Sequence, residues 1–265
     1  MQKRFLFSLI ILYTSKGFAQ QSLEDTTIIT DRPDLTESSR AVPYKSIQIE
    51  TGFLMLVEKP SESSEFSTTL YQFPTTLVRF GFLKNAELRI FNQFVNERAN
   101  NPSTPFNERS TYGIDNLQIG TKINLTTEKG LRPEIALLSH VVLPFGTDDF
   151  KNAKTLFNFV FSLSHTLSNK LSLGYNLGWT TDNINANGTG TYTLVFGYTI
   201  SPKIGFYTEA YGLLKNLETG TLGLDGGVTY LLNNKIQLDL SVARSVSEEN
   251  YFFSTGFSWL IPEVF

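Results

Sequence analysis

The chain has no cysteine, no long apolar run after its first twenty residues and no excess of charge. Without cysteine it can form neither disulfides nor thiolate metal sites. The formal net charge is -3 and basic residues do not cluster, so nucleic acid is excluded as a partner. Since no later segment approaches the roughly 20 apolar residues of a spanning helix, a place in a membrane would require a closed β-barrel.

Residues 1–19 are predicted to be a secretory signal peptide. Lys3 and Arg4 precede an apolar run over residues 5–13, and small residues follow before the expected cleavage site. This run is too short to span a bilayer, and no cysteine follows it for lipid attachment. Residues 20–45 are polar, contain proline and have no sustained period, which predicts an extended N-terminal arm.

From residue 46 onward the sequence alternates apolar with polar residues in about twelve runs. Apolar residues do not recur at helical spacing over a useful length. The runs are about twice as long as an ordinary strand, and they match the roughly 9–11 residues with which a tilted strand crosses a bilayer. They cover residues 46–57, 70–82, 86–96, 115–126, 132–143, 155–167, 170–182, 190–200, 203–214, 220–232, 235–245 and 251–261.

Tight turns such as LKN and NN alternate with longer polar connections such as EKPSESSEFSTT and PFGTDDFKNAK. In outer-membrane barrels, short turns face the periplasm and longer loops face outside. An even strand count puts both chain ends on the periplasmic side. The pattern predicts an all-β fold, a closed antiparallel transmembrane β-barrel of about 12 strands over residues 46–265, in the outer membrane of a Gram-negative bacterium.

Charge separates the two faces of the predicted strands. The apolar phase, for example Leu171, Leu173 and Tyr175, lacks charged residues except for Arg244 near a strand end. A charge on the lipid face at the bilayer midplane costs roughly 2–4 kcal/mol, so this face is predicted to contact outer-membrane lipid. The opposite face is predicted to line the lumen, where the candidates for a substrate path are Glu50, Arg79, Glu87, Arg89, Lys122, Glu134, Glu209 and Asp239.

These inward charges have two interpretations. They either form a selectivity lining or substrate path, or they pair across neighbouring strands and stiffen the barrel. The arm adds Asp31, Arg32, Asp34 and Glu37 just before the first strand. The arm either folds into the barrel as a plug, with Arg32 meeting lumen carboxylates and its acids meeting lumen arginines, or extends as a solvated periplasmic tail.

Two predicted strands depart from simple alternation. The run LYQFPTTLVRFGF contains Pro74 and has apolar residues on both phases, and the run at 132–143 is apolar almost throughout. Proline in a sheet is found at bulges and strand starts, so a bulge is one explanation for the first run. In the second run, Leu138 and Val142 are expected to line part of the lumen.

The stretch TDRPDLTESSRAVPYKSIQIETGF resembles the opening of the barrel family named for the meta-pathway of phenol degradation. TTLVRFGF and AELRIFNQF resemble its second and third strands, and GIDNLQIGTKINL resembles its fourth. These are outer-membrane transporters frequent in Bacteroidetes-type bacteria. The resemblance implies a channel that passes small solutes, including aromatic or hydrophobic ones, through a narrow polar lumen. Phe265 resembles the terminal aromatic residue that the outer-membrane assembly machinery recognises.

Two rival functions stay open. A barrel enzyme acting on lipid needs a serine with a base and an orienting group, and the chain's histidines, His140 beside Ser139 and His165 near Ser164, lack an evident third partner. No catalytic residue is assigned and an enzyme is not expected. A non-conducting adhesive barrel would act through its loops, above all 97–114. No metal or cofactor is expected, because two histidines and scattered acids lack ligand spacing.

Overall fold

The computed structural model describes residues 27–60, 66–100, 109–182, 186–247 and 250–264. The predicted signal peptide and the start of the arm lie outside these residues. The described part of the chain contains no helix that is long and apolar enough to cross a membrane.

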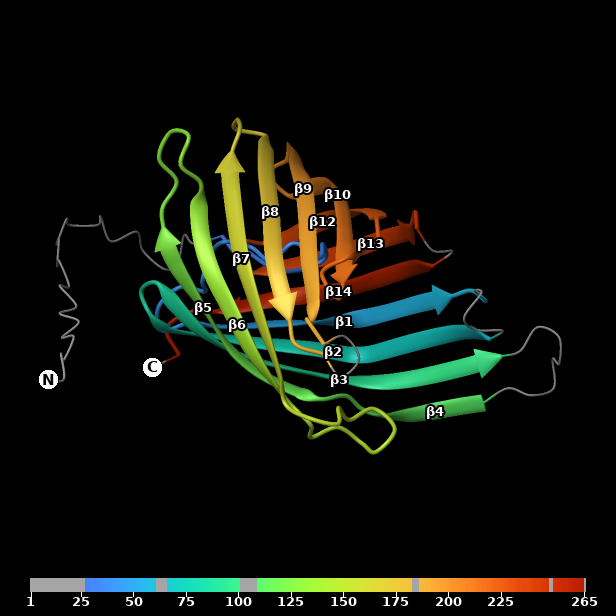
Figure 1. Ribbon diagram of the computed structural model, residues 1–265. Helices are drawn as coiled ribbons and strands as arrows, with labels where there is room; N and C mark the ends of the chain where they lie inside the picture. The colour runs from blue at the N-terminus through green and yellow to red at the C-terminus, as the bar shows by residue number, and fades with distance from the viewer. Residues whose placement is uncertain (1–26, 61–65, 101–108, 183–185, 248–249, 265) are drawn as a thin grey trace, which may run out of the picture.

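The described residues form one antiparallel sheet that closes on itself (Figure 1), because β1 pairs with β14 and β9 pairs with β10. Two of its 14 strands are short additions: β4 pairs with β3 beside β5, and β11 pairs with the end of β10. Twelve strands therefore make the wall, and the predicted closed barrel of about 12 strands is confirmed. The strands are β1 (Ile47–Glu58), β2 (Ser67–Leu83), β3 (Ala86–Asn100), β4 (Arg109–Ile114), β5 (Leu117–Thr126), β6 (Glu134–Leu143), β7 (Leu156–Thr166), β8 (Leu171–Thr180), β9 (Thr189–Ser201), β10 (Ile204–Lys215), β11 (Thr219–Gly220), β12 (Gly223–Asn233), β13 (Ile236–Ser245) and β14 (Tyr251–Ile261).

One predicted loop is partly wrong. Residues 97–100 belong to β3 and residues 109–114 form β4, and the two pair from Phe94 opposite Ile114 to Ala99 opposite Arg109. Polar residues such as Asn96 and Arg98 hide this hairpin in the sequence. A hairpin that extends beyond the bilayer needs backbone partners but no apolar face, so it has no alternating pattern to detect.

The irregular run at 70–82 is explained by a β-bulge. The register of β2 against β1 shifts between Gly52 and Leu54, and its register against β3 shifts between Gln72 and Thr75, on either side of Pro74. An extra residue moves the inward positions from one phase to the other. Apolar residues on both phases of this strand are therefore consistent with one apolar outer face.

The outer face of the wall is apolar and uncovered. Large side chains such as Leu238, Leu240 and Val242 on successive outward positions of β13 are each at least 40% exposed. Monomeric soluble proteins rarely expose contiguous apolar surfaces of this extent. In an outer-membrane barrel this surface faces acyl chains.

Residues 27–46, here called the arm, lie inside the barrel at the end where the short turns gather. In Figure 1 the arm is the blue segment behind β7 and β8. Its two apolar anchors, Ile28 and Val42, are buried against Leu260 and Leu231 of the wall. The Ile28 N–H also donates to the carbonyl of Asn234 in the β12–β13 turn. By the rule that short turns face the periplasm, the arm occupies the periplasmic half of the lumen.

Candidate functional site

Three buried cations lie side by side on the inner wall. Arg79 on β2 stands directly opposite Arg89 on β3, and the next position, Glu87, stands opposite Lys122 on β5. All four side chains are almost completely buried. Like charges directly opposite each other destabilise a sheet, so the Arg79–Arg89 pair requires nearby counter-charges.

The wall supplies part of this counter-charge. Arg79 donates from Nε to Glu87 at 2.8 Å and from a terminal nitrogen to Glu50 at 2.8 Å. Arg89 donates to the same Glu87 at 2.9 Å. The two pairs of Arg79 join β2 to its neighbours β1 and β3, in line with one interpretation of the inward charges, and the Arg89–Glu87 pair lies within β3. With both glutamates ionised, the three cations still exceed the wall carboxylates in this cluster.

The arm supplies the missing charge through Asp31. Its carboxylate accepts from Arg89 at 2.5 Å, from Lys122 at 2.8 Å and from Arg79 at 3.2 Å, and its backbone N–H donates to Glu50. Burial acts to raise the pKa of Asp31, but Arg79, Lys122 and Arg89 together hold that pKa well below its usual value. Asp31 therefore stays ionised and ties three strands to the arm.

Arg32 points to the opposite wall. Its guanidinium donates to Asp239 on β13 through two nitrogens, at 2.9 and 3.2 Å, and to Ser254 on β14 at 3.0 Å. A Cβ atom added to either Gly52 or Gly256 would lie 2.6 Å from the guanidinium. These two glycines face each other across β1 and β14, so they form the flat place on the wall where Arg32 fits.

The middle of the arm is held by β8, β9 and β10, and its contact with β8 is the hydrogen bond that the Glu37 N–H donates to Asn176. Leu35 N–H and the Thr36 hydroxyl both donate to Glu209, and Thr36 also shares a hydrogen bond with Thr193. Glu37 pairs with Arg89 at 3.0 Å and with Lys122 at 3.4 Å. Burial raises the pKa of Glu37 to about 7, more than Arg89 lowers it.

The last part of the arm crosses β7, β6 and β5 before it reaches β1. Ser39 Oγ lies 2.7 Å from Ser164 Oγ and also donates to Glu134, and Arg40 pairs with Glu134 at 2.9 Å. The Ala41 N–H donates to Asn124. Hydrogen bonds to the wall therefore follow the arm around most of the barrel's circumference.

Asp34 and the neighbouring carboxylates of Glu209 and Asp225 differ from the other acids around the arm, because they have no cation partner among the described residues. Glu209 and Asp225 stand opposite each other on β10 and β12, and both Asp225 oxygens are buried without a hydrogen-bond donor among the described residues. Burial and the charge of Glu209 raise the pKa of Asp34. Within the described residues no cation pairs with these acids, so this side of the lumen holds acids without a counter-charge, and their burial favours the neutral form.

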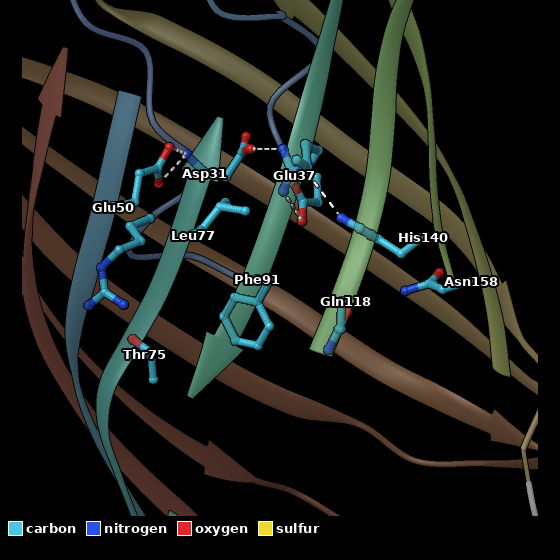
Figure 2. A pocket seen from close by; sticks show the side chains of 11 residues that line it. Asp31, Glu37, Glu50, Thr75, Leu77, Phe91, Gln118, His140 and Asn158 are labelled. Carbon is cyan, nitrogen blue, oxygen red and sulfur yellow. Dashed lines mark hydrogen bonds and ion pairs between the residues drawn. The ribbon is translucent and has the colours of Figure 1, made fainter. Parts of the chain in front are cut away.

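Above the arm, on the side of the longer loops, lies a cavity of about 230 Å³. Figure 2 shows Asp31 and Glu37 from the arm and Glu50 from β1 at one end of it, with Thr75, Leu77, Phe91 and Gln118 extending from the wall. We call this cavity the cup. Its full lining is Asp31, Arg32, Glu37, Glu50, Thr75, Leu77, Arg89, Phe91, Gln118, His140 and Asn158.

The candidate lumen residues that the sequence predicted all lie around the arm. Each of the eight wall residues, from Glu50 to Asp239, is paired with the arm or with a residue that contacts it, and three of the four arm residues contact wall charges. Sequence reasoning missed the cup residues Leu77, Phe91 and Asn158, whereas strand alternation places Gln118 on the inward face. The three missed residues share the inward face with Arg79, Arg89 and His140, so strand alternation was the signal that could have found them.

Neither histidine is arranged as a catalytic base. His140 accepts a hydrogen bond from Arg89 Nε at 3.3 Å, and His165 stacks on Tyr175 with its Nε2 3.5 Å from the tyrosine hydroxyl. No group of three or more histidine, aspartate or glutamate side chains in the described ranges is placed to hold a metal ion.

A family model described as "Putative MetA-pathway of phenol degradation" matches residues 30–261. No curated protein matches the chain. An outer-membrane channel from Pseudomonas putida has the same fold, with a TM-score of 0.62 at 10% identity over 84% of this chain and 98% of that chain. KdgM porin has a TM-score of 0.52 at 8% identity over 80% of this chain and 98% of that one.

The translocator domain of the autotransporter NalP from Neisseria meningitidis is also similar, with a TM-score of 0.50 at 11% identity over 81% of this chain and 88% of that one. At these identities the structures show a shared fold. That fold is the outer-membrane β-barrel, as the length and faces of the strands predicted.

Proposed function

The chain belongs to the family described as "Putative MetA-pathway of phenol degradation", and on this premise we propose that it is an outer-membrane channel for small solutes. The family's description favours small aromatic or hydrophobic solutes. The channel role fits a closed wall with a polar, charged inner face and an apolar outer face that contacts lipid. An enzyme acting on lipid is not favoured, since the barrels of the same fold named above are a channel, a porin and a translocator.

The observation that carries the proposal is the position of the arm. Asp31, Arg32, Glu37 and the residues between them bind walls on opposite sides of the lumen. An interior that a twelve-stranded barrel would leave partly open is thereby narrowed on the periplasmic side. We propose that the arm is a constriction, and that the wall residues Glu50, Arg79, Glu87, Arg89, Lys122, Glu134, Glu209 and Asp239 hold it and line the path around it. The assembly machinery is proposed as a folding partner; Phe265 lies outside the described residues.

Single-channel recording in planar bilayers tests this role. Removing residues 21–40 from the mature protein should raise the unitary conductance several-fold, because it empties the periplasmic half of the lumen. A difference in migration between heated and unheated samples on a detergent gel shows whether the shortened barrel is folded. A folded deletion variant with the conductance of the full chain would contradict a constriction by the arm.

A reversible cross-link gives a second test without deleting charge. Because the chain has no cysteine, Ser39→Cys with Ser164→Cys creates the sole thiol pair, at a place where the two hydroxyl oxygens are 2.7 Å apart. In moderate urea the arm should leave the lumen before the barrel unfolds, because it is bound without a strand ladder of its own. Conductance should then rise in the reduced protein and stay low in the oxidised protein. An equal rise in both forms would contradict the proposal.

A further inference from the structure

The cup has the size of a site for one small ring. Its volume of about 230 Å³ exceeds the roughly 150 Å³ cavity that holds benzene in an engineered protein, and it lies below the roughly 300–1,000 Å³ of pockets for drug-sized ligands. The arm forms its floor, so a solute that enters from the side of the longer loops meets the cup before it meets the constriction.

One part of the cup is apolar. Leu77 on β2 and Phe91 on β3 stand directly opposite each other, and both face inward one position beyond the Arg79–Arg89 pair. In Figure 2, Leu77 and the Phe91 ring lie between the ionic residues of the floor and the side chains of Thr75 and Gln118. Adjacent inward apolar side chains of this kind provide a surface for the face or edge of a ring.

The adjoining part of the cup, on β5, β6 and β7, carries neutral hydrogen-bonding groups. Gln118 pairs in register with Phe91, and Asn158 pairs in register with His140. Within the described ranges the side-chain amides of Gln118 and Asn158 have no hydrogen-bond partner. Because Nε2 of His140 accepts from Arg89, the proton of the neutral ring is on Nδ1, which makes this histidine a donor.

The ionic groups of the floor do not favour an anion. Asp31, Glu37 and Glu50 line the cup together with Arg32 and Arg89. Both arginines already hold carboxylates, Arg32 that of Asp239 and Arg89 those of Asp31 and Glu37. An anionic solute would therefore meet an excess of negative charge without a free cation to bind.

We propose that the cup is a binding subsite for an uncharged, single-ring solute with one hydrogen-bonding substituent, whose ring lies on Leu77 and Phe91 and whose substituent faces Gln118, His140 and Asn158. This inference rests on the proposed channel function and specifies the solute. The geometry selects against carboxylates of the same shape.

Benzamide and benzoate are matched probes, because they have the same size and differ in charge. In titration calorimetry with the detergent-solubilised full chain at neutral pH, benzamide should bind and benzoate should bind at least about tenfold more weakly. Phe91→Ala should weaken benzamide binding about tenfold. Phe252→Ala is the control: this phenylalanine also faces the lumen, but from β14 and outside the cup, and its replacement should leave binding unchanged.

A double variant, Gln118→Leu with Asn158→Leu, tests the polar side. It should lose benzamide binding and gain affinity for toluene, which no general loss of structure would produce. Equal binding of benzamide and benzoate, or equal loss with Phe91→Ala and Phe252→Ala, overturns the subsite. If the cup binds neither probe while solutes still enter liposomes through the protein, only the subsite fails; if no solute passes with or without the arm, the channel function fails.

Discussion

At the scale of single residues, the binding site of the Arg32 guanidinium on the wall depends on two glycines. Gly52 and Gly256 face each other on β1 and β14, and the guanidinium lies across both to reach Asp239. A methyl group at either position would meet both the arginine and a backbone carbonyl at 2.4 Å. The side chain can move but the carbonyl cannot, so the alanine would displace Arg32 or distort the strand.

We predict that Gly256→Ala weakens the binding of the arm by about 1–3 kcal/mol, the usual cost of overpacking a filled site. Hydrogen exchange of the amides in residues 31–42 should become about ten- to a hundredfold faster. Gly220→Ala is the control, since its nearest neighbour would be a Leu214 carbon at 3.6 Å. Unchanged exchange in the arm of a folded Gly256→Ala barrel would contradict this account of Arg32.

At this scale, the alternation of side chains along a strand determines which residue positions the sequence can predict. Arg79, Arg89 and Lys122 could be placed on the inner face because strand side chains alternate and charge is costly against lipid. Their partners could not be identified, since pairing depends on register, and register across several strands is not visible in one sequence. The contact of Asp31 with all three cations could not be predicted for this reason, because 48 to 91 residues of sequence separate Asp31 from them.

At the scale of the element, the arm is a segment without regular secondary structure that is ordered by its side chains and amides. The sequence left it open whether this segment is a plug or a tail, because both are polar and lack a period. What decides between them is the surplus of cations on β2, β3 and β5, which only a carboxylate from outside the wall can balance. The electrostatics of the barrel thus determine the position of the arm.

The arm should respond to pH through Glu37. Its pKa is about 7 in the docked arm and near 4.5 in a released one, so the docked state binds more protons between these values. Docking should therefore lose stability as the pH rises from about 4.5 to about 7 and change little above that. Asp31 affects docking in the opposite direction, because its pKa is lowered in the docked arm. This effect matters only in stronger acid, below the usual pKa of 3.8.

The expected measurement is the urea concentration at which single-channel conductance rises. For the native sequence it should be higher at pH 5 than at pH 8. Glu37→Gln should reduce this difference, and Glu37→Gln with Asp34→Asn should reduce it further, because the pKa of Asp34 is also raised in the docked arm. Glu218→Gln, in the exposed connection after β10, should keep it. A pH difference of unchanged size in Glu37→Gln would show that Glu37 does not control the release.

At the scale of the whole molecule, the wall and the arm together produce an interior with more acidic than basic side chains. The arm and the ionic residues around it contribute more carboxylates than cations: Asp31, Asp34, Glu37, Glu50, Glu87, Glu134, Glu209, Asp225 and Asp239 against Arg32, Arg40, Arg79, Arg89 and Lys122. The surplus is concentrated on β10 and β12, where Glu209 and Asp225 have no cation among the described residues. Low-dielectric walls extend the effect of such a charge along a narrow path.

At a pH high enough to ionise these acids, whose burial favours the neutral form, the channel should prefer cations. In a potassium chloride gradient across a planar bilayer, the reversal potential should indicate a several-fold preference for potassium over chloride. Asp225→Asn should reduce this preference without opening the lumen, because the amide can donate to Glu209 and leave the arm in place. Asp148→Asn, in the exposed β6–β7 loop, should leave the preference unchanged. A chloride preference in the native protein would mean that ions avoid the acidic side of the arm, and the path would then have to follow the Arg79–Lys122 wall.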